Sequence, residues 1–276
     1  MRASVAHVSR LEYDADVFES IMDVRLGPLD DADQHVERFH LRLEPGGHAR
    51  QYVDGFGNVA HLLTSTRPHT GVEVSVRSEV ETSLSDPFAL PAHGPGALDV
   101  IERADGLDPS PLIPPLEELG RMASPFRSLD PFEAVLRMCE MIHRQFTYRQ
   151  GVTDVTTTVE QILDVRLGVC QDFAHLLIGL CRALSIPARY VSGYIVAADA
   201  PAAPHRGEGA SHAWVEAFTP SHGWRGFDPT NNLVANAYYV KVARGRDYAD
   251  VPPTRGTYRG AANERLAVSV TTRVLA

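Results

Sequence analysis

Cys170 occupies a position in this sequence that suits a nucleophile. It follows Gly168 closely and opens the apolar stretch CQDFAHLLIGLCRAL, which predicts a buried helix. The first turn of a helix carries partial positive charge and unpaired N–H groups, so a cysteine there gains thiolate character. Because a lone cysteine at a helix start more often serves packing, the assignment needs partners elsewhere in the chain.

His212 and Asp228 are the partners that the sequence offers. A thiolate nucleophile needs a base, and the base needs a group that orients it. His212 stands near the start of the predicted strand in SHAWVEAF, and Asp228 ends the predicted strand in GWRGFD. The connection TPSHG is short enough for a hairpin, which brings both side chains onto neighbouring strands. With the Cys170 helix packed across this sheet, we predict a Cys–His–Asp triad.

Three further residues in these stretches are candidates for the neighbourhood of the triad. Asp172, two residues into the helix, could stabilise the helix terminus or bind a substrate amine, and we expect the structural role. Trp214 and Trp224 lie in the two predicted strands, where we expect them to shield the site or fill the core.

The elements that must position these residues follow a β-rich beginning. Alternating apolar residues in HVERFHLRLEP and GVEVSVRSEV, separated by Asp-Gly and Gly-Asn turns, predict a small antiparallel domain over residues 1–84. A proline-rich connector is expected over residues 85–128, with short helices at 97–101 and 116–122.

The predicted catalytic core spans residues 129–262, and a C-terminal strand or tail spans residues 263–276. The core begins with a helix for which Asp130 is the predicted N-cap and Pro131 the first helical residue. The Cys170 helix and then the antiparallel strands follow. Helices that precede a sheet in this way predict an α+β fold.

Three ordered blocks of the sequence resemble one family. GVCQDFAHLLIGLCRALSIPARYVSGY, SHAWVEAF and GWRGFDPTNN look like the core blocks of the transglutaminase-like superfamily, whose fold is papain-like. The stretches YVDGFGN and RPHTGVEVSV resemble the N-terminal β domain of bacterial transglutaminase-like proteins. The later segment GRDYADVPPTRGTYRG resembles the part that follows their core.

The resemblance implies thiol acyl chemistry without a cofactor. It puts Cys170 in the place of the nucleophile, His212 in that of the base and Asp228 in that of the third member. Papain-like members also use an upstream side chain as an oxyanion donor, and Tyr148 in QFTYRQG is the candidate here. The backbone N–H of Cys170 is the stronger candidate donor. The substrate is then a peptide or protein, with or without an amine acceptor, and hydrolysis and acyl transfer both remain open.

Composition narrows the other possibilities. The formal charge of −9, without a Lys/Arg-rich run, disfavours nucleic-acid binding, and no apolar stretch is long enough to span a membrane. Three cysteines without a Cys-x-x-Cys pair favour a cytoplasmic protein without a zinc site. A metal-dependent enzyme is disfavoured because no His-x-x-x-His pair occurs. The main alternative is a non-catalytic peptide-binding module on the same fold, against which the complete triad argues.

Overall fold

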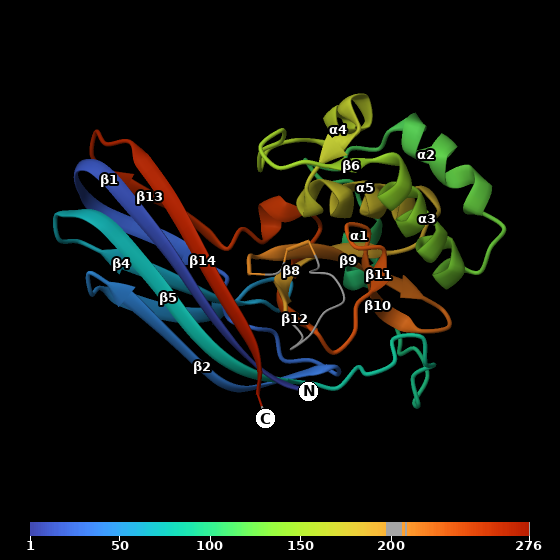
Figure 1. The fold of residues 1–276 in the computed structure, drawn as a ribbon, viewed down its shortest axis with the longest axis horizontal. Helices are drawn as coiled ribbons and strands as arrows, with labels where there is room; N and C mark the ends of the chain where they lie inside the picture. The colour runs from blue at the N-terminus through green and yellow to red at the C-terminus, as the bar shows by residue number, and fades with distance from the viewer. Residues whose placement is uncertain (197–205, 208, 276) are drawn as a thin grey trace.

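The computed structural model describes residues 1–196, 206–207 and 209–275, which form two β-sheets and a group of helices (Figure 1). The first sheet, at the left of Figure 1, has the order β2-β5-β1-β4-β3. Its strands are β1 (Arg2–Val24), β2 (Gln34–Glu44), β3 (His48–Val53), β4 (Val59–Ser65) and β5 (His69–Thr82). Buried residues alternate along β1 and β5, as the sequence pattern predicts for strands with one face covered.

The end of the chain returns to this first sheet. Strands β13 (Thr254–Arg259) and β14 (Glu264–Leu275) both pair antiparallel with β1. We predicted a core over residues 129–262 and a C-terminal strand or tail over residues 263–276. The structure has the C-terminal strand, but β13 already leaves the core, so both β13 and β14 belong to the N-terminal sheet. The physical reason is the length of β1, since its first half pairs with β5 on one side and leaves its other side for β14.

The proline-rich connector is ordered and carries two short helices, α1 (Val100–Leu107) and α2 (Glu117–Ala123), followed by η1 (Ser124–Phe126). Helix α2 matches its prediction closely. Helix α1 starts later than predicted because the Asp99 side chain accepts hydrogen bonds from the N–H groups of Ile101 and Glu102 and thereby caps it. Helix α2 packs on the Cys170 helix, where Leu119 lies directly above Gly179.

The second sheet is the platform of the core. It is antiparallel with the order β11-β10-β9-β8-β12. The helices of the core are α3, which Asp130 caps as predicted, α4 and α5. In chain order, the elements of the core are α3 (Pro131–Gln145), β6 (Thr147–Tyr148), α4 (Val159–Val165), β7 (Leu167–Gly168), α5 (Cys170–Ala183), β8 (Ala188–Ile195), β9 (His212–Thr219), β10 (Gly223–Asp228), β11 (Leu233–Val234), β12 (Tyr239–Gly245) and η2 (Tyr248–Asp250).

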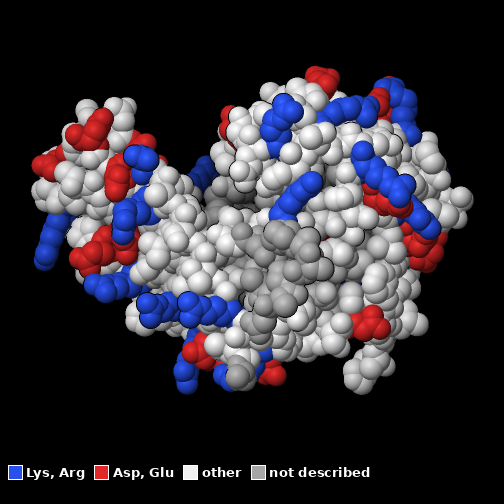
Figure 2. All heavy atoms as spheres, in the orientation of Figure 1, with Lys and Arg blue, Asp and Glu red and all other residues white. Residues whose placement is uncertain are grey.

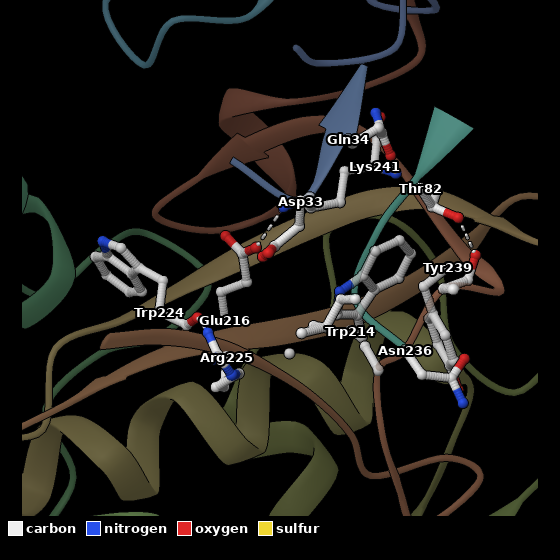
Figure 3. Close-up of a pocket in the computed structure, with 14 residues that line it drawn as sticks. Asp33, Gln34, Thr82, Trp214, Glu216, Trp224, Arg225, Asn236, Tyr239 and Lys241 are labelled. Atoms are coloured by element: carbon white, nitrogen blue, oxygen red, sulfur yellow. Dashed lines mark hydrogen bonds and ion pairs between the residues drawn. The ribbon is translucent and has the colours of Figure 1, made fainter. Parts of the chain in front are cut away.

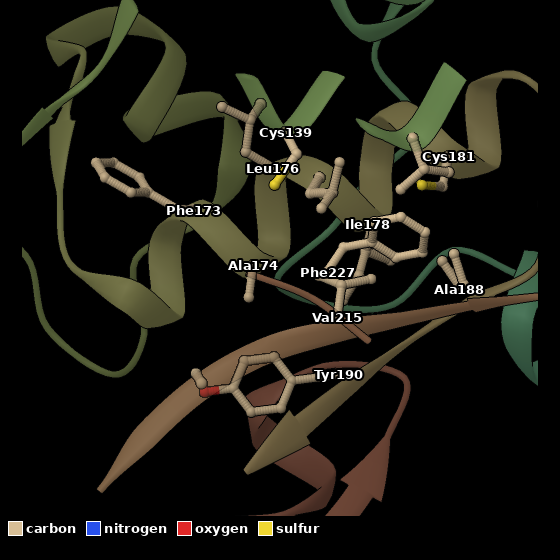
Figure 4. Close-up of a cluster of buried hydrophobic side chains, with 14 of the residues drawn as sticks. Cys139, Phe173, Ala174, Leu176, Ile178, Cys181, Ala188, Tyr190, Val215 and Phe227 are labelled. Atoms are coloured by element: carbon tan, nitrogen blue, oxygen red, sulfur yellow. The ribbon is translucent and has the colours of Figure 1, made fainter. Parts of the chain in front are cut away.

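Helix α5 is the centre of the core. It contacts β8 and β9 on one side and α2, α3 and α4 on the other, so it is apolar on most of its surface. Figure 4 shows its residues above the sheet, with Ala174 and Ile178 near Tyr190, Val215 and Phe227. Cys181 is buried there, and burial raises the pKa of its thiol to about 12. Burial likewise raises the pKa of the Cys139 thiol, so neither group competes as a nucleophile.

The two sheets are joined by specific hydrogen bonds. The edge of β12 is bonded by two amide side chains from the first sheet: Gln34 bonds the backbone of Lys241, and Asn58 bonds the backbone of Arg244. These bonds cover an edge that would otherwise expose unpaired backbone groups. Figure 2 shows a hollow between the first sheet, at the left, and the helical part, at the right. Basic and acidic side chains are interspersed on this face. Among the described residues, no helix is long and apolar enough to cross a membrane.

Candidate active site

The chain enters helix α5 through a tight and specific arrangement. Strands β6 and β7 pair in parallel, and Arg149 N–H donates to the carbonyl of Gly168. A Cβ added at Gly168 would lie 2.7 Å from the Cβ of Asp172, so only glycine fits there. The helix then begins at Cys170, whose side chain is partly buried. As the first helical residue, Cys170 has a backbone N–H without an intrahelical partner.

Asp172 is held by the protein itself. Its Oδ2 accepts hydrogen bonds from the N–H of Val169 and the hydroxyl of Thr153, both at 2.7 Å. Burial raises the pKa of Asp172, and the two hydrogen bonds oppose the rise. Its Oδ1 is buried without a hydrogen-bond partner among the described residues. Asp172 therefore bonds the backbone of the N-cap residue and stabilises the first turn of α5, which carries Cys170.

His212 begins β9 and is buried against Asp228. Its Nε2 lies 2.8 Å from Oδ2 of the carboxylate, and both side chains are fully enclosed. Burial alone would lower the pKa of His212, but the charge and hydrogen bond of Asp228, together with the Cys170 thiol, raise it. The other nitrogen, Nδ1, is buried and makes no hydrogen bond among the described residues, which leaves it for the thiol.

Asp228 accepts five hydrogen bonds, two at Oδ1 and three at Oδ2. Oδ1 accepts from the backbone N–H groups of Thr230 and Asn231, at 2.9 and 3.1 Å. Oδ2 accepts from His212, from the Asn231 amide at 2.8 Å and from the Tyr239 hydroxyl at 2.9 Å. Burial would raise the pKa of Asp228, but His212 and these donors hold it below its usual range. The carboxylate thus stays charged and fixes the imidazole.

Asn231, which follows β10, and Arg206 and Gly207, which precede β9, form a lip over the imidazole. Asn231 accepts from the N–H of Arg206 at 2.9 Å and donates to its carbonyl at 3.1 Å. A Cβ added at the next residue, Gly207, would lie 2.4 Å from Nδ1 of His212. The sequence pattern did not single out Arg206, Gly207 or Tyr239, because only the folded chain brings them to His212 and Asp228.

Tyr148 lies close to the thiol. The pairing of β6 with β7 sets it beside Gly168, two residues before Cys170. Burial raises the pKa of the Tyr148 hydroxyl, and negative charge on Cys170 adds to the rise. Its ring contacts Phe173 edge-on and lies 5.1 Å from the guanidinium of Arg206. The structure thus brings Tyr148 to the site, where its role as oxyanion donor stays a prediction.

The two tryptophans, Trp214 and Trp224, lie in different parts of the sheet. Trp214 is buried, stacks on His212 at 6.2 Å between ring centroids, and meets Tyr239 edge-on at 5.3 Å. Trp224 is opposite Phe218 at the far end of β9, beneath the guanidinium of Arg189. Figure 3 shows Trp214 beside Tyr239, with Trp224 at the other end of the cavity. Trp214 therefore packs against the predicted triad. Trp224, which we expected to shield the site or fill the core, is half-buried and lies away from the triad, against Phe218 and Arg189.

The chain matches two family models and has relatives of nearly full length. Residues 121–229 match the family model of the transglutaminase-like superfamily, and residues 3–81 match that of the bacterial transglutaminase-like N-terminal region. An uncharacterized protein of Mycobacterium tuberculosis is 35% identical over 98% of this chain and 91% of its own length. One from Mycobacterium leprae is 32% identical over 98% of each chain.

Two further comparisons involve proteins with named activities. A crystal structure from Cytophaga hutchinsonii, described as a "putative cysteine protease", superposes with a TM-score of 0.76 at 26% identity, over 99% of this chain and 90% of that one. A protein-glutamine gamma-glutamyltransferase of Pseudomonas aeruginosa is 31% identical over 43% of this chain and 19% of its own length. The predicted α+β fold, a transglutaminase-like core with an N-terminal β domain, is confirmed. The chain belongs to the transglutaminase-like superfamily.

Proposed function

We propose that this protein performs acyl chemistry on an amide or peptide carbonyl through a thioester on Cys170, with hydrolysis as its main outcome. One observation carries the proposal. Asp228 engages Nε2 of His212, and the buried Nδ1 is left for the thiol at the start of α5. This is the arrangement that activates a cysteine nucleophile, because the oriented imidazole can take and return a proton at one defined atom.

In the first step, the Cys170 sulfur attacks the carbonyl carbon while His212 Nδ1 holds the thiol proton. A carbon–sulfur bond forms, and the carbonyl oxygen becomes an oxyanion. The backbone N–H of Cys170 and the Tyr148 hydroxyl are the donors that we assign to this oxygen. The carbon–nitrogen bond then breaks, and Nδ1–H gives its proton to the leaving amine, so a thioester remains on the enzyme.

In the second step, a nucleophile attacks the thioester carbon and gives a proton to His212 Nδ1. The carbon–sulfur bond breaks, and Cys170 is regenerated. With water the product is an acid, so the enzyme is a peptidase or amidase, and with an amine the product is a new amide. The cysteine protease description of the Cytophaga structure supports the first reaction, and the name of the Pseudomonas relative supports the second.

Mass spectrometry of peptide products tests the proposal. Wild type and Cys170→Ala are incubated with a set of glutamine-containing peptides, with and without a primary amine. Cleavage reports peptidase action, exchange of the side-chain NH₂ for OH reports amidase action, and an amine adduct reports transfer. Cys170→Ala should show none of these products, while Cys181→Ala, which alters a buried thiol on the same helix, should retain them.

Two outcomes would overturn the proposal. Turnover by Cys170→Ala at more than a trace would remove Cys170 from its role. Absence of every product from wild type across the peptide set, with Cys170 alkylating only slowly, would favour the non-catalytic binding module instead.

A further inference from the structure

We infer that Arg206 selects substrates that carry a carboxylate beside the reacting amide, as an acidic residue of a peptide does. The inference rests on the proposed function, because it gives that same site a substrate class. Arg206 lies next to the proposed triad but is neither its nucleophile nor its base.

The backbone of Arg206 is held in place by Asn231, a residue that also bonds Asp228. Asn231 accepts from its N–H and donates to its carbonyl, and the same Asn231 amide donates to Asp228. The following residue, Gly207, has a φ of +96° and lies against the imidazole of His212. Arg206 thus lies between two fixed contacts, its own bonds to Asn231 and the packing of Gly207 against His212. Its Cα therefore has a defined position on the rim of the site.

The side chain of Arg206 crosses to the opposite rim. Its guanidinium lies 5.1 Å from the centroid of the Tyr148 ring. Negative charge on Cys170 raises the pKa of the Tyr148 hydroxyl, and positive charge on Arg206 opposes that rise. The guanidinium therefore lies between the lip over His212 and the strand that pairs beside Gly168, two residues before the thiol.

Arg206 has charge to offer a ligand. It is exposed, and no carboxylate of the described residues lies within ion-pair distance of it, whereas Arg137 and Arg246 each face acidic partners. A guanidinium held by its backbone and resting on an aromatic ring presents its remaining N–H groups as a fork, which matches a carboxylate. A carboxylate that flanks the reacting amide is the group that this fork fits.

Alkylation of Cys170 by two small reagents tests the charge without any turnover. Iodoacetate carries a carboxylate and iodoacetamide does not. The rate with iodoacetate divided by the rate with iodoacetamide therefore reports positive charge beside the Cys170 thiol. We expect Arg206→Gln to lower this ratio by about 2- to 5-fold, and Arg206→Glu to lower it further, as exposed charge pairs do. Arg50→Gln, at an exposed arginine of β3, should leave it unchanged. A ratio that Arg206→Glu does not move would overturn the inference.

Paired peptides test selection itself. Peptides that differ only in Glu, Gln or Lys beside the reacting residue are compared by kcat/KM. Wild type should prefer Glu, and Arg206→Glu should prefer Lys, with both preferences weakened by salt. Equal kcat/KM for the three peptides would refute the inference while leaving the proposed function intact. If no peptide reacts at all, the proposed function fails, and the alkylation ratio still decides the charge of the site.

Discussion

Replacement of Asp228 by asparagine tests how the triad is oriented. The carboxylate receives two backbone N–H groups on Oδ1 and three side-chain donors on Oδ2. An amide can accept with only one of its two ends. The two backbone donors cannot change their character, so the new NH₂ group should replace Oδ2. There His212 can change tautomer and accept at Nε2, which places its proton on Nδ1.

The size of the effect follows from these changes. With a proton on Nδ1, the neutral imidazole cannot accept the thiol proton. We expect kcat/KM to fall by about 10⁴-fold, the size known for an amide in place of a triad carboxylate. The Asn231 amide and the Tyr239 hydroxyl must also turn or lose a partner, which should cost about 1–3 kcal/mol of unfolding free energy.

The assay combines peptide turnover with unfolding by urea between pH 4 and 9. In the wild type, the raised pKa of His212 stabilises the fold fully below its unfolded value of about 6.5, and this contribution is lost as pH rises through the folded value. The lowered pKa of Asp228 contributes above about pH 3.9 and is lost as pH falls through its folded value. The stability difference between wild type and variant should therefore be largest between about pH 4 and 6.5.

Asp164→Asn, at an exposed carboxylate on α4, is the matched control and should change neither quantity. If Asp228→Asn keeps more than about a tenth of wild-type kcat/KM, the carboxylate does not set the tautomer, and the reasoning is refuted.

Three other substitutions probe the same site. His212→Ala should move the pH midpoint of Cys170 alkylation upward, because the imidazolium that favours the thiolate is gone, and an unmoved midpoint would separate His212 from the thiol. Tyr239→Phe removes one donor to the Asp228 carboxylate, so unfolding in urea should show a loss of about 1.5–3 kcal/mol, and no loss would mean that this hydrogen bond is dispensable. Gly168→Ala should cost about 1–3 kcal/mol by thermal or urea unfolding and slow the alkylation of Cys170, because the new Cβ meets Asp172. Gly120→Ala, where a Cβ meets nothing within 4 Å, should be neutral or stabilising, and equal effects of the two glycine substitutions would contradict the packing argument.

Local sequence was enough to predict the elements that carry the three proposed triad residues. A glycine and an apolar run predict the start of a buried helix at Cys170, and two strands joined by a short connection predict that His212 and Asp228 are neighbours. The structure has helix α5 and the β9–β10 pair at these positions. These relations are local because each depends on residues within one element or one hairpin. The alternation of the first 84 residues predicted strands for the same reason.

Only the tertiary structure decided what surrounds the triad. Tyr239 reaches Asp228 from β12, at the opposite edge of the sheet from β11, and Asn231 joins Arg206 to the Asp228 carboxylate. The pairing of β14 with β1 joins the two ends of the chain and moves the predicted domain boundary. An alternating pattern states that a strand has two faces, but it does not state which strand lies beside it. That choice depends on which edges and side chains remain uncovered once the whole chain has packed.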